Sequence, residues 1–159
     1  MKVLGIDPGL ADTGIGIVCG NGLQVHGFAF GSISTSQKAA LSERLETIYT
    51  KLQGVLRREM PDLMVVEDVF SLERYPKSGI LLGKVTGVIL LAGCHIHVPI
   101  QEIPVREAKQ VLTGNGNASK AQLEKAVRHA LHLKDPIRPF HASDALGLAL
   151  IGLFRQRRC

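Results

Sequence analysis

A short apolar strand that ends on a carboxylate constrains this chain more than any other feature. Val3-Leu4-Gly5-Ile6 runs directly into Asp7-Pro8-Gly9, and Thr13-Gly14 follows. A buried carboxylate needs a cation, a set of hydrogen bonds or a shifted pKa. The neighbouring glycines and proline supply a turn and leave space for a ligand to approach the backbone. Asp7 is therefore either a turn residue or a site residue, and the rest of the chain decides between the two.

The composition is that of one soluble globular domain covering residues 1–159. Hydrophobic residues make up 45% of the chain and charged residues 21%, which is ordinary for such a domain. No apolar run reaches the roughly 18 residues that span a membrane, and no signal-peptide pattern is present, so we expect no membrane association. Cys19, Cys94 and Cys159 form no CxxC pair. They predict neither a disulfide framework nor a zinc site, and they favour a reducing, cytoplasmic location.

The positive charge lies mainly in the second half of the chain. Residues 1–79 carry 8 Lys/Arg and 9 Asp/Glu, whereas residues 80–159 carry 11 and 5. A one-sided basic field is typical of proteins that bind polyanions. This distribution favours nucleic acid as the partner over a generic basic surface.

Hydrophobic periodicity predicts three antiparallel strands, a crossover helix, further strands and then helices. The expected strands are Val3–Ile6, Gly14–Cys19, Leu23–Ser32, Leu63–Val66 and, at a sheet edge, His95–Ile103. Asn21-Gly22 predicts a hairpin turn between the second and third of these strands. The expected helices are Lys38–Glu59 with Ser36 as N-cap, Ser78–Ala92, Pro104–Leu112, a helix capped by Ser119 that runs to Leu131, and His141–Phe154. The simplest closure is an α/β fold with a five-stranded mixed sheet flanked by helices on both faces.

Four candidate site residues follow from this arrangement. Asp7 and Glu67 both end apolar strands, and parallel neighbours in one sheet would bring the two carboxylates together. His141 and Asp144 share one face of an otherwise apolar helix. Such oxygen donors and an imidazole can hold Mg²⁺ or Mn²⁺ ions, and two ions suit the hydrolysis of a phosphodiester. Individually, Asp144 could interact with the helix dipole, His141 could cap the helix, and Glu67 could pair with an arginine.

Three segments resemble the motifs of RuvC-type Holliday junction resolvases. They are Gly5-Ile-Asp7-Pro-Gly9 with Thr13-Gly14, Val66-Glu67-Asp-Val-Phe70 and His141-Ala-Ser-Asp144-Ala-Leu146. The similarity covers nearly the whole chain and includes Val105-Arg-Glu-Ala-Lys109-Gln and Gly116-Asn-Ala-Ser-Lys120. The resemblance implies an RNase H-like (ribonuclease H-like) fold and a homodimer that nicks two opposed strands of a four-way DNA junction, in DNA recombination and repair.

The resemblance assigns catalytic and metal-binding roles to Asp7, Glu67, His141 and Asp144, with two Mg²⁺ or Mn²⁺ ions per active site. Better-known members have Asp at the position of His141, while others have His, as this chain does. A neutral imidazole removes one negative charge and is a softer ligand than a carboxylate. We therefore expect Mn²⁺ to be preferred over Mg²⁺.

The resemblance also implies the contacts with DNA. Phe70 would stack on an unpaired base at the junction centre, assisted by Tyr75, although Phe70 could instead be a core residue. Lys109 and Lys120 would contact phosphates near the active site, and Arg106 would contact the DNA backbone unless it is a solvated surface residue.

The resemblance further implies two protein partners. The first is a second copy of the chain, for which the surplus apolar surface of the helix between Ile80 and Leu91 is the candidate interface. The second is the RuvA/RuvB branch-migration complex.

Three other readings stay open at the level of the sequence. The chain could be an RNase H-like nuclease that acts on RNA or R-loops. Gly-Ile-Asp-Pro-Gly also resembles the phosphate loop of actin-like ATPases and sugar kinases, but these need a second domain, for which we expect 159 residues to be too few. The third reading is a junction-binding protein without catalytic activity, against which the complete set of candidate metal ligands argues.

Overall fold

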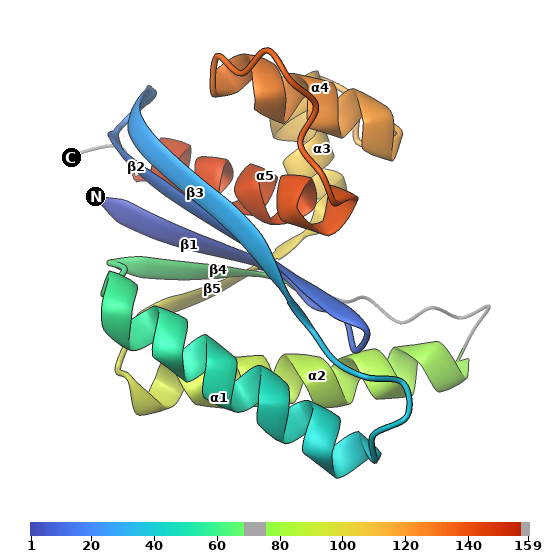
Figure 1. Ribbon diagram of the computed structural model, residues 1–159. Coiled ribbons are helices and arrows are strands. Elements are labelled where there is room, and N and C mark those ends of the chain that lie inside the picture. Colours follow the sequence, from blue (N-terminus) through green and yellow to red (C-terminus); the bar gives the residue numbers. More distant parts are fainter. Residues whose placement is uncertain (69–75, 157–159) are drawn as a thin grey trace.

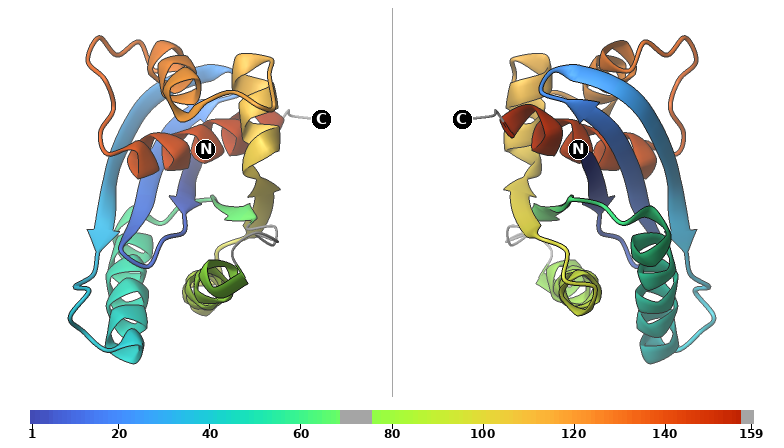
Figure 2. Two further views of the ribbon diagram at one scale, coloured as in Figure 1. Left: turned by 90° about the vertical axis from the view of Figure 1, so that its right-hand side faces the viewer. Right: turned by 90° about the vertical axis from the view of Figure 1, so that its left-hand side faces the viewer.

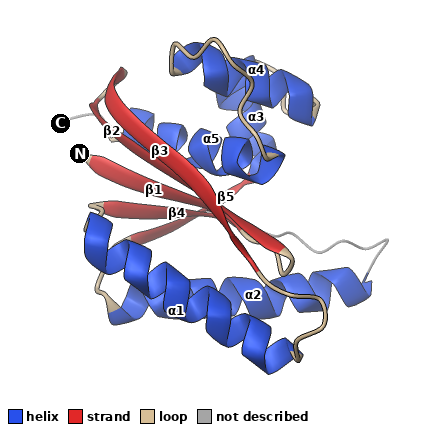
Figure 3. Ribbon diagram, viewed as in Figure 1, coloured by secondary structure: helices blue, strands red, loops and turns tan. Residues whose placement is uncertain are grey.

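A five-stranded mixed sheet separates two layers of helices (Figure 1, Figure 3). The computed structural model describes residues 1–68 and 76–156. The strands are β1 Lys2–Asp7, β2 Asp12–Asn21, β3 Gln24–Ser34, β4 Leu63–Asp68 and β5 Ile100–Pro104. The helices are α1 Leu41–Glu59, α2 Pro76–His95, α3 Val105–Thr113, α4 Lys120–Ala130 and α5 Phe140–Arg155. The predicted α/β class, with helices on both faces of the sheet, is confirmed.

The strand order is β3-β2-β1-β4-β5, which puts β1 at the centre of the sheet. The first three strands form an antiparallel meander, and β4 and β5 are added in parallel. Within the meander, β2 and β3 form the hairpin predicted at Asn21-Gly22, where Gly22 has a φ of +60°. Because α1 carries the chain from the meander back to the other side of β1, β4 lies beside β1 as expected.

Each face of the sheet is covered by helices (Figure 2) and has its own apolar core. On one face α1 and α2 lie against the sheet, and their completely buried Leu52 and Ile89 belong to the same cluster as Leu4 of β1. On the other face α5 lies against β1 and β2, and α3 and α4 pack on α5. The residues of α5 from Ala142 to Leu153 are all buried, which explains why this helix is apolar on every side.

Two predicted boundaries are wrong. The helix α1 begins at Leu41 and not at Lys38, and Ser36 is not its N-cap. Ala40 occupies the cap position, and its N–H donates to the Glu43 carboxylate at 3.1 Å. Ser36 Oγ accepts from the N–H of Lys38 in the preceding turn, because a serine hydroxyl can stabilise a local turn as well as a helix end.

The strand expected from His95 to Ile103 is shorter. Residues up to His95 continue α2, a turn follows in which His97 has a φ of +59°, and β5 begins at Ile100. Alternating hydrophobicity over this stretch reflects the last turn of a helix followed by a loop, which periodicity alone does not distinguish from a strand. The expected edge position of β5 is confirmed.

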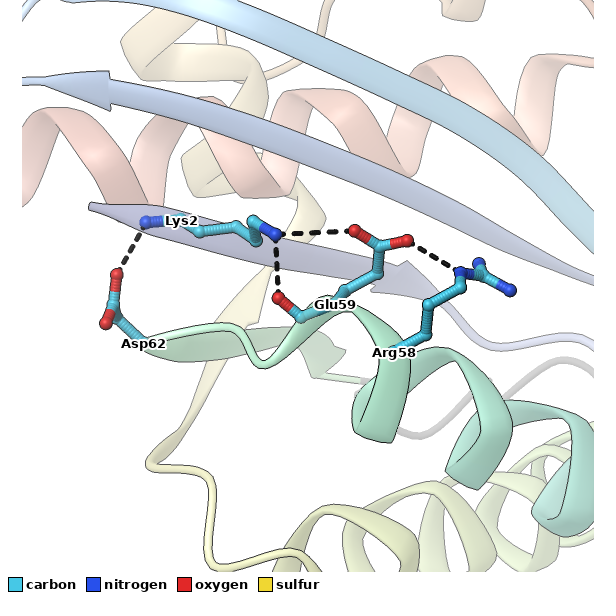
Figure 4. Close-up of polar contacts among 4 residues, drawn as sticks. All are labelled: Lys2, Arg58, Glu59 and Asp62. Atoms are coloured by element: carbon cyan, nitrogen blue, oxygen red, sulfur yellow. Dashed lines mark hydrogen bonds and ion pairs between the residues drawn. The ribbon is translucent and has the colours of Figure 1, made fainter.

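A polar cluster secures the register of β1 and β4 at the end opposite Asp7 (Figure 4). The backbone N–H of Lys2 donates to Asp62 Oδ2 at 2.6 Å, just before β4 begins. The Lys2 ammonium donates to the Glu59 carbonyl at 2.7 Å, and Glu59 Oε1 accepts from Arg58 Nε at 2.8 Å. These contacts connect the start of β1 to the end of α1 and the start of β4, so that the two strands advance in step toward their carboxyl ends.

The helix α2 has one buried face and one exposed apolar face. Val85, Ile89 and Ala92 are completely buried in the core, whereas Ile80 is 63% exposed and Leu91 49% exposed. By length and composition alone, Lys77–His95 could cross a membrane, and this is the single such helix within residues 1–68 and 76–156. Its buried face makes it part of the domain core, and its exposed face leaves apolar surface for a partner to cover.

Candidate active site

The carboxylates of Asp7 and Glu67 meet at the carboxyl ends of two neighbouring strands. The parallel register pairs Ile6 of β1 with Val66 of β4, so the next residue of each strand is an acid. Burial of Glu67, followed by its interaction with the Asp7 carboxyl group and by the charge of Asp144, raises the pKa of Glu67 to about 9. The expectation that strand pairing brings the two acids together is confirmed.

Three glycines, Gly5 in β1 and Gly14 and Gly16 in β2, let the backbone of α5 pack directly against the backbones of these two strands. A Cβ at Gly14 would overlap the carbonyl oxygen of His141, and a Cβ at Gly5 would overlap the carbonyl oxygen of Ala145. A Cβ at Gly16 would lie 2.4 Å from the backbone nitrogen of Leu146, which is a steric clash. The space that the sequence suggested for a ligand is therefore occupied by α5 itself. This corrects the interpretation of Gly5 and Gly14, and it explains how His141 and Asp144 reach Asp7.

His141 and Asp7 form a direct polar contact across the sheet–helix interface. His141 Nδ1 and Asp7 Oδ2 are 2.6 Å apart, although the two residues are 134 positions apart in the chain. The hydrogen bond that the protonated His141 imidazole donates to the Asp7 carboxylate raises the pKa of His141, against a smaller opposing effect of burial. The structure thus places the half-exposed His141 beside Asp7 of the acidic cluster, and Pro139, not His141, occupies the N-cap position of α5.

Asp144 lies one helical turn further along α5, and it is buried with 7% of its surface exposed. Burial, followed by the charge of Asp7, raises the pKa of the Asp144 carboxyl to about 6. Its Oδ2 lies 3.7 Å from the Lys120 ammonium at the first turn of α4. Its Oδ1 is completely buried and hydrogen-bonds none of the described residues.

The donor set fits a divalent cation. Within residues 1–68 and 76–156, no three His, Cys, Asp or Glu side chains are already arranged to hold one metal ion together. However, Asp144 Oδ1 is a buried acceptor with no donor among the described residues, and burial together with like charges raises the pKa of both Glu67 and Asp144. Hard oxygen ligands with uncompensated negative charge are what Mg²⁺ and Mn²⁺ require.

The basic residues predicted to bind DNA are found at different distances from the acids. Lys120 contacts Asp144, and Lys109 of α3 is close enough for its charge to lower the pKa of Asp144. Arg106 instead lies against the loop after α3, where a Cβ at Gly116 would come within 3.0 Å of Arg106 Cγ. Phe70 and Tyr75 lie outside the described residues.

Two sets of hydrogen bonds that support the loops around the site were not predicted from the sequence. Thr35 Oγ1 donates to the Leu10 carbonyl at 2.5 Å and accepts from Arg44 Nε at 2.8 Å, which secures the turn that follows Asp7. Gln110 braces the loop before Lys120, because its Oε1 accepts from the N–H of Gly116 at 2.9 Å and its Nε2 donates to the Gly114 carbonyl at 3.0 Å. No local pattern marks these residues, since their partners come from other elements or across a loop. The predicted N-cap at Ser119 is confirmed, with its side chain accepting from the N–H of Gln122.

Comparison with known proteins places this chain in a family. Residues 3–152 match the family model of crossover junction endodeoxyribonuclease RuvC. The protein of that name from Prosthecochloris aestuarii is 37% identical to this chain, over 96% of this chain and 81% of the relative. The corresponding protein from Carboxydothermus hydrogenoformans is 36% identical, over 98% of this chain and 97% of the relative.

Solved structures agree in fold. The structure of Thermus thermophilus RuvC superposes with a TM-score of 0.85 at 32% identity, covering 97% of this chain and 94% of that one. T. thermophilus RuvC in complex with a Holliday junction substrate gives a TM-score of 0.87 at 33% identity, covering 97% and 93%. The expected RNase H-like fold is confirmed by these neighbours. The chain belongs to the crossover junction endodeoxyribonuclease RuvC family.

Proposed function

We propose that this protein is an endonuclease that resolves four-way (Holliday) DNA junctions by hydrolysing phosphodiester bonds, in recombination and repair. The observation that carries the proposal is the convergence of Asp7, Glu67, His141 and Asp144 from β1, β4 and α5, beside Lys120. Two solved structures of one family member, T. thermophilus RuvC, have the same fold, and one of them is described in complex with a Holliday junction substrate.

The family is one of divalent-metal-dependent nucleases, and Asp7, Glu67, His141 and Asp144 would hold Mg²⁺ or Mn²⁺, with two ions per site. When bound, such ions activate the attacking water and stabilise the leaving oxygen. The imidazole in place of a fourth carboxylate supports a preference for Mn²⁺. Burial of Asp7 and Asp144 excludes bulk water from these carboxylates, which strengthens their interaction with any cation they hold.

The lysines next to the acidic cluster would position the DNA. Lys120 extends from the first turn of α4 toward Asp144 and remains 60% exposed, so that its ammonium can contact a phosphate oxygen. Lys109 would contact a neighbouring phosphate, and Arg106 would act on DNA mainly by supporting the loop around Gly116. Phe70 and Tyr75 would stack on unpaired bases at the junction centre.

Two opposed strands of a junction require two active sites related by two-fold symmetry. We assign the homodimer interface to the exposed face of α2, where Ile80, Leu81 and Leu91 leave apolar surface uncovered. A partner on this face would cover exposed residues of a helix whose composition is apolar enough to cross a membrane. The proposal further includes the RuvA/RuvB branch-migration complex as a protein partner and the cytoplasm as the location of the protein.

Cleavage of a synthetic mobile four-way junction tests the function. The wild-type protein and Asp7→Asn are compared with Mg²⁺ or Mn²⁺, on the junction, linear duplex, an RNA/DNA hybrid and single-stranded DNA. We expect paired nicks in the junction alone, and we expect Asp7→Asn to bind the junction without cutting it. Preferred cleavage of the hybrid would indicate an RNA-processing nuclease, and cleavage by Asp7→Asn would refute the mechanism.

A further inference from the structure

The strand β3 forms an unusually unprotected edge of the sheet. It spans Gln24–Ser34, and within the described part of the chain its only strand neighbour is β2. Its sequence, QVHGFAFGSIS, contains no Asp, Glu, Lys, Arg or Pro. Natural edge strands are usually short or carry charges or proline, since an open row of N–H and C=O groups otherwise pairs with another strand. An uncharged edge of eleven residues therefore indicates a partner strand.

Two glycines in β3 are not explained by the fold of a single chain. A Cβ at Gly27 or Gly31 would meet no atom within 4 Å, and neither residue has the positive φ that favours glycine. Gly14 and Gly16 on the adjacent strand are different, because the backbone of α5 excludes a Cβ at both positions. Glycine inside a strand weakens it and often marks the close approach of another backbone. At Gly27 and Gly31 that backbone does not come from the described residues.

The same segment exposes two aromatic rings. Phe28 is 36% exposed and Phe30 43% exposed, on either side of Ala29. Their partners on β2 are Val18 and Gly16, so both rings lie on the face of the sheet that carries α5. Gly31 and Ala29 pair with Ile15 and Ile17, whose side chains belong to the core on the α1 face. One face of the edge is thus aromatic, and the other is nearly without side chains.

The five residues Gly27-Phe28-Ala29-Phe30-Gly31 read the same in both directions. In an antiparallel pair of identical strands centred on Ala29, Phe28 lies opposite Phe30, and Gly27 lies opposite Gly31. Opposed aromatic residues stabilise antiparallel strand pairs, and the absence of charge removes like-charge repulsion between identical strands. A strand that complements itself in this way fits a second copy of the chain better than an unrelated peptide.

We propose that β3 pairs with β3 of a second copy, antiparallel and across a two-fold axis at Ala29, so that two five-stranded sheets become continuous. Figure 2 shows β3 at the edge of the sheet away from α2, so this contact is separate from the interface assigned to α2. It adds one further step of association to whatever state α2 supports, and it does not depend on nuclease activity. A pairing of so few residues is weak, so the step occurs at high protein concentration.

Paired charges at the two glycines test this arrangement. Open space around both positions allows substitution without disturbing the fold of one chain. In Gly27→Lys/Gly31→Lys, each introduced ammonium group lies opposite another across the axis, and the pairing is lost. In Gly27→Lys/Gly31→Glu, each ammonium group lies opposite a carboxylate, and the pairing is restored. Sedimentation equilibrium of the full chain measures the average mass over a range of concentrations, and thermal unfolding checks that both variants fold.

We expect the mass of the wild type and of the Lys/Glu variant to rise through one doubling step that the Lys/Lys variant lacks. Amide exchange over residues 27–31 should slow as concentration rises in the first two proteins only. Equal masses for the wild type and the Lys/Lys variant would overturn the proposal and leave β3 to a strand from another protein. Failure of the Lys/Glu variant to restore the step would also overturn it, because any charge at the edge would then have the same effect.

Discussion

The imidazole of His141 lies 2.6 Å from the carboxylate of Asp7, and this contact joins the last helix to the central strand at the acidic cluster. An imidazole here supplies a neutral ligand where a carboxylate would add a negative charge. It also competes with a cation for Asp7 Oδ2 as long as it is protonated. The identity of this one residue therefore controls both the charge of the cluster and the freedom of Asp7.

The substitution His141→Asp should shift metal preference toward Mg²⁺. The added carboxylate is a harder ligand and increases the negative charge of the cluster, so the ratio of Mn²⁺-supported to Mg²⁺-supported cleavage should fall by about tenfold, or about 1.4 kcal/mol. Initial cleavage rates at saturating concentrations of each ion measure the ratio. His97→Asp, at an exposed position outside the site, is the control and should leave the ratio unchanged. Equal rates with both ions in the wild type would contradict the Mn²⁺ preference.

Gly14→Ala should destabilise the protein and reduce cleavage together. The added methyl group overlaps the His141 carbonyl oxygen, so α5 must move away from β2 at a cost of about 1–3 kcal/mol. Denaturant unfolding of the metal-free protein measures the first effect, and junction cleavage measures the second. Gly54→Ala in α1 is the matched control, since no atom lies within 4 Å of the added Cβ and alanine favours a helix by roughly 0.5–1 kcal/mol. If both variants were equally stable, the close approach of α5 would not require glycine.

The metal-free protein should lose stability as pH rises. The folded-state pKa of Glu67 is raised to about 9 and that of Asp144 to about 6, so each group favours folding below its ordinary pKa of 4.5 or 3.8. That contribution is lost as pH rises through the folded-state values, and the raised pKa of His141 acts in the same direction. Between pH 5 and 9, we expect Tm to fall by about 4 °C or more.

Glu67→Gln removes the largest of these titrations and should flatten the dependence of Tm on pH. Adding Mg²⁺ or Mn²⁺ at high pH should recover Tm in the wild type more than in Glu67→Gln, because the ionised carboxylate is the form that binds a cation. Thermal unfolding monitored by circular dichroism, with a chelator or with each ion, provides both readouts. A wild-type Tm that rises with pH in the metal-free state would be inconsistent with a raised pKa at Glu67.

Lys120→Ala should slow cleavage about 100-fold, and it should weaken junction binding much less. Lys120 Nζ lies 3.7 Å from Asp144 Oδ2, so we expect its ammonium to act at the reacting phosphate and to be one of many charges that attract the DNA. Single-turnover cleavage and a binding titration separate the two effects. Lys51→Ala in α1 removes the same charge from the opposite face of the sheet and should affect neither by more than a few-fold. An equal loss of cleavage rate in Lys120→Ala and Lys51→Ala would mean that Lys120 acts only through general electrostatic attraction of the DNA.

The sequence determined the elements and the identity of the four candidate ligands. The Asn21-Gly22 turn, the apolar run from Leu63 to Val66 and the Ser119 cap are local signals, and the structure contains the hairpin, the buried strand and the helix that they predicted. Strand ends at Asp7 and Glu67 were enough to predict their pairing, because two parallel neighbours bring the same ends together. The predicted element boundaries were wrong near Ser36 and His95, where the same local pattern is compatible with more than one structure.

Only the tertiary structure decided how the site closes. From the sequence, the glycines near Asp7 were interpreted as space for a ligand. In the fold, the backbone of α5 packs against Gly5 and Gly14, and this packing brings His141 and Asp144 close to the two strand ends. The raised pKa values, the buried Asp144 oxygen without a partner and the approach of Lys120 follow from that packing. Local patterns determine which element forms. Burial, charge proximity and backbone contact are properties of residues far apart in the chain, and they exist only once the sheet and α5 have come together.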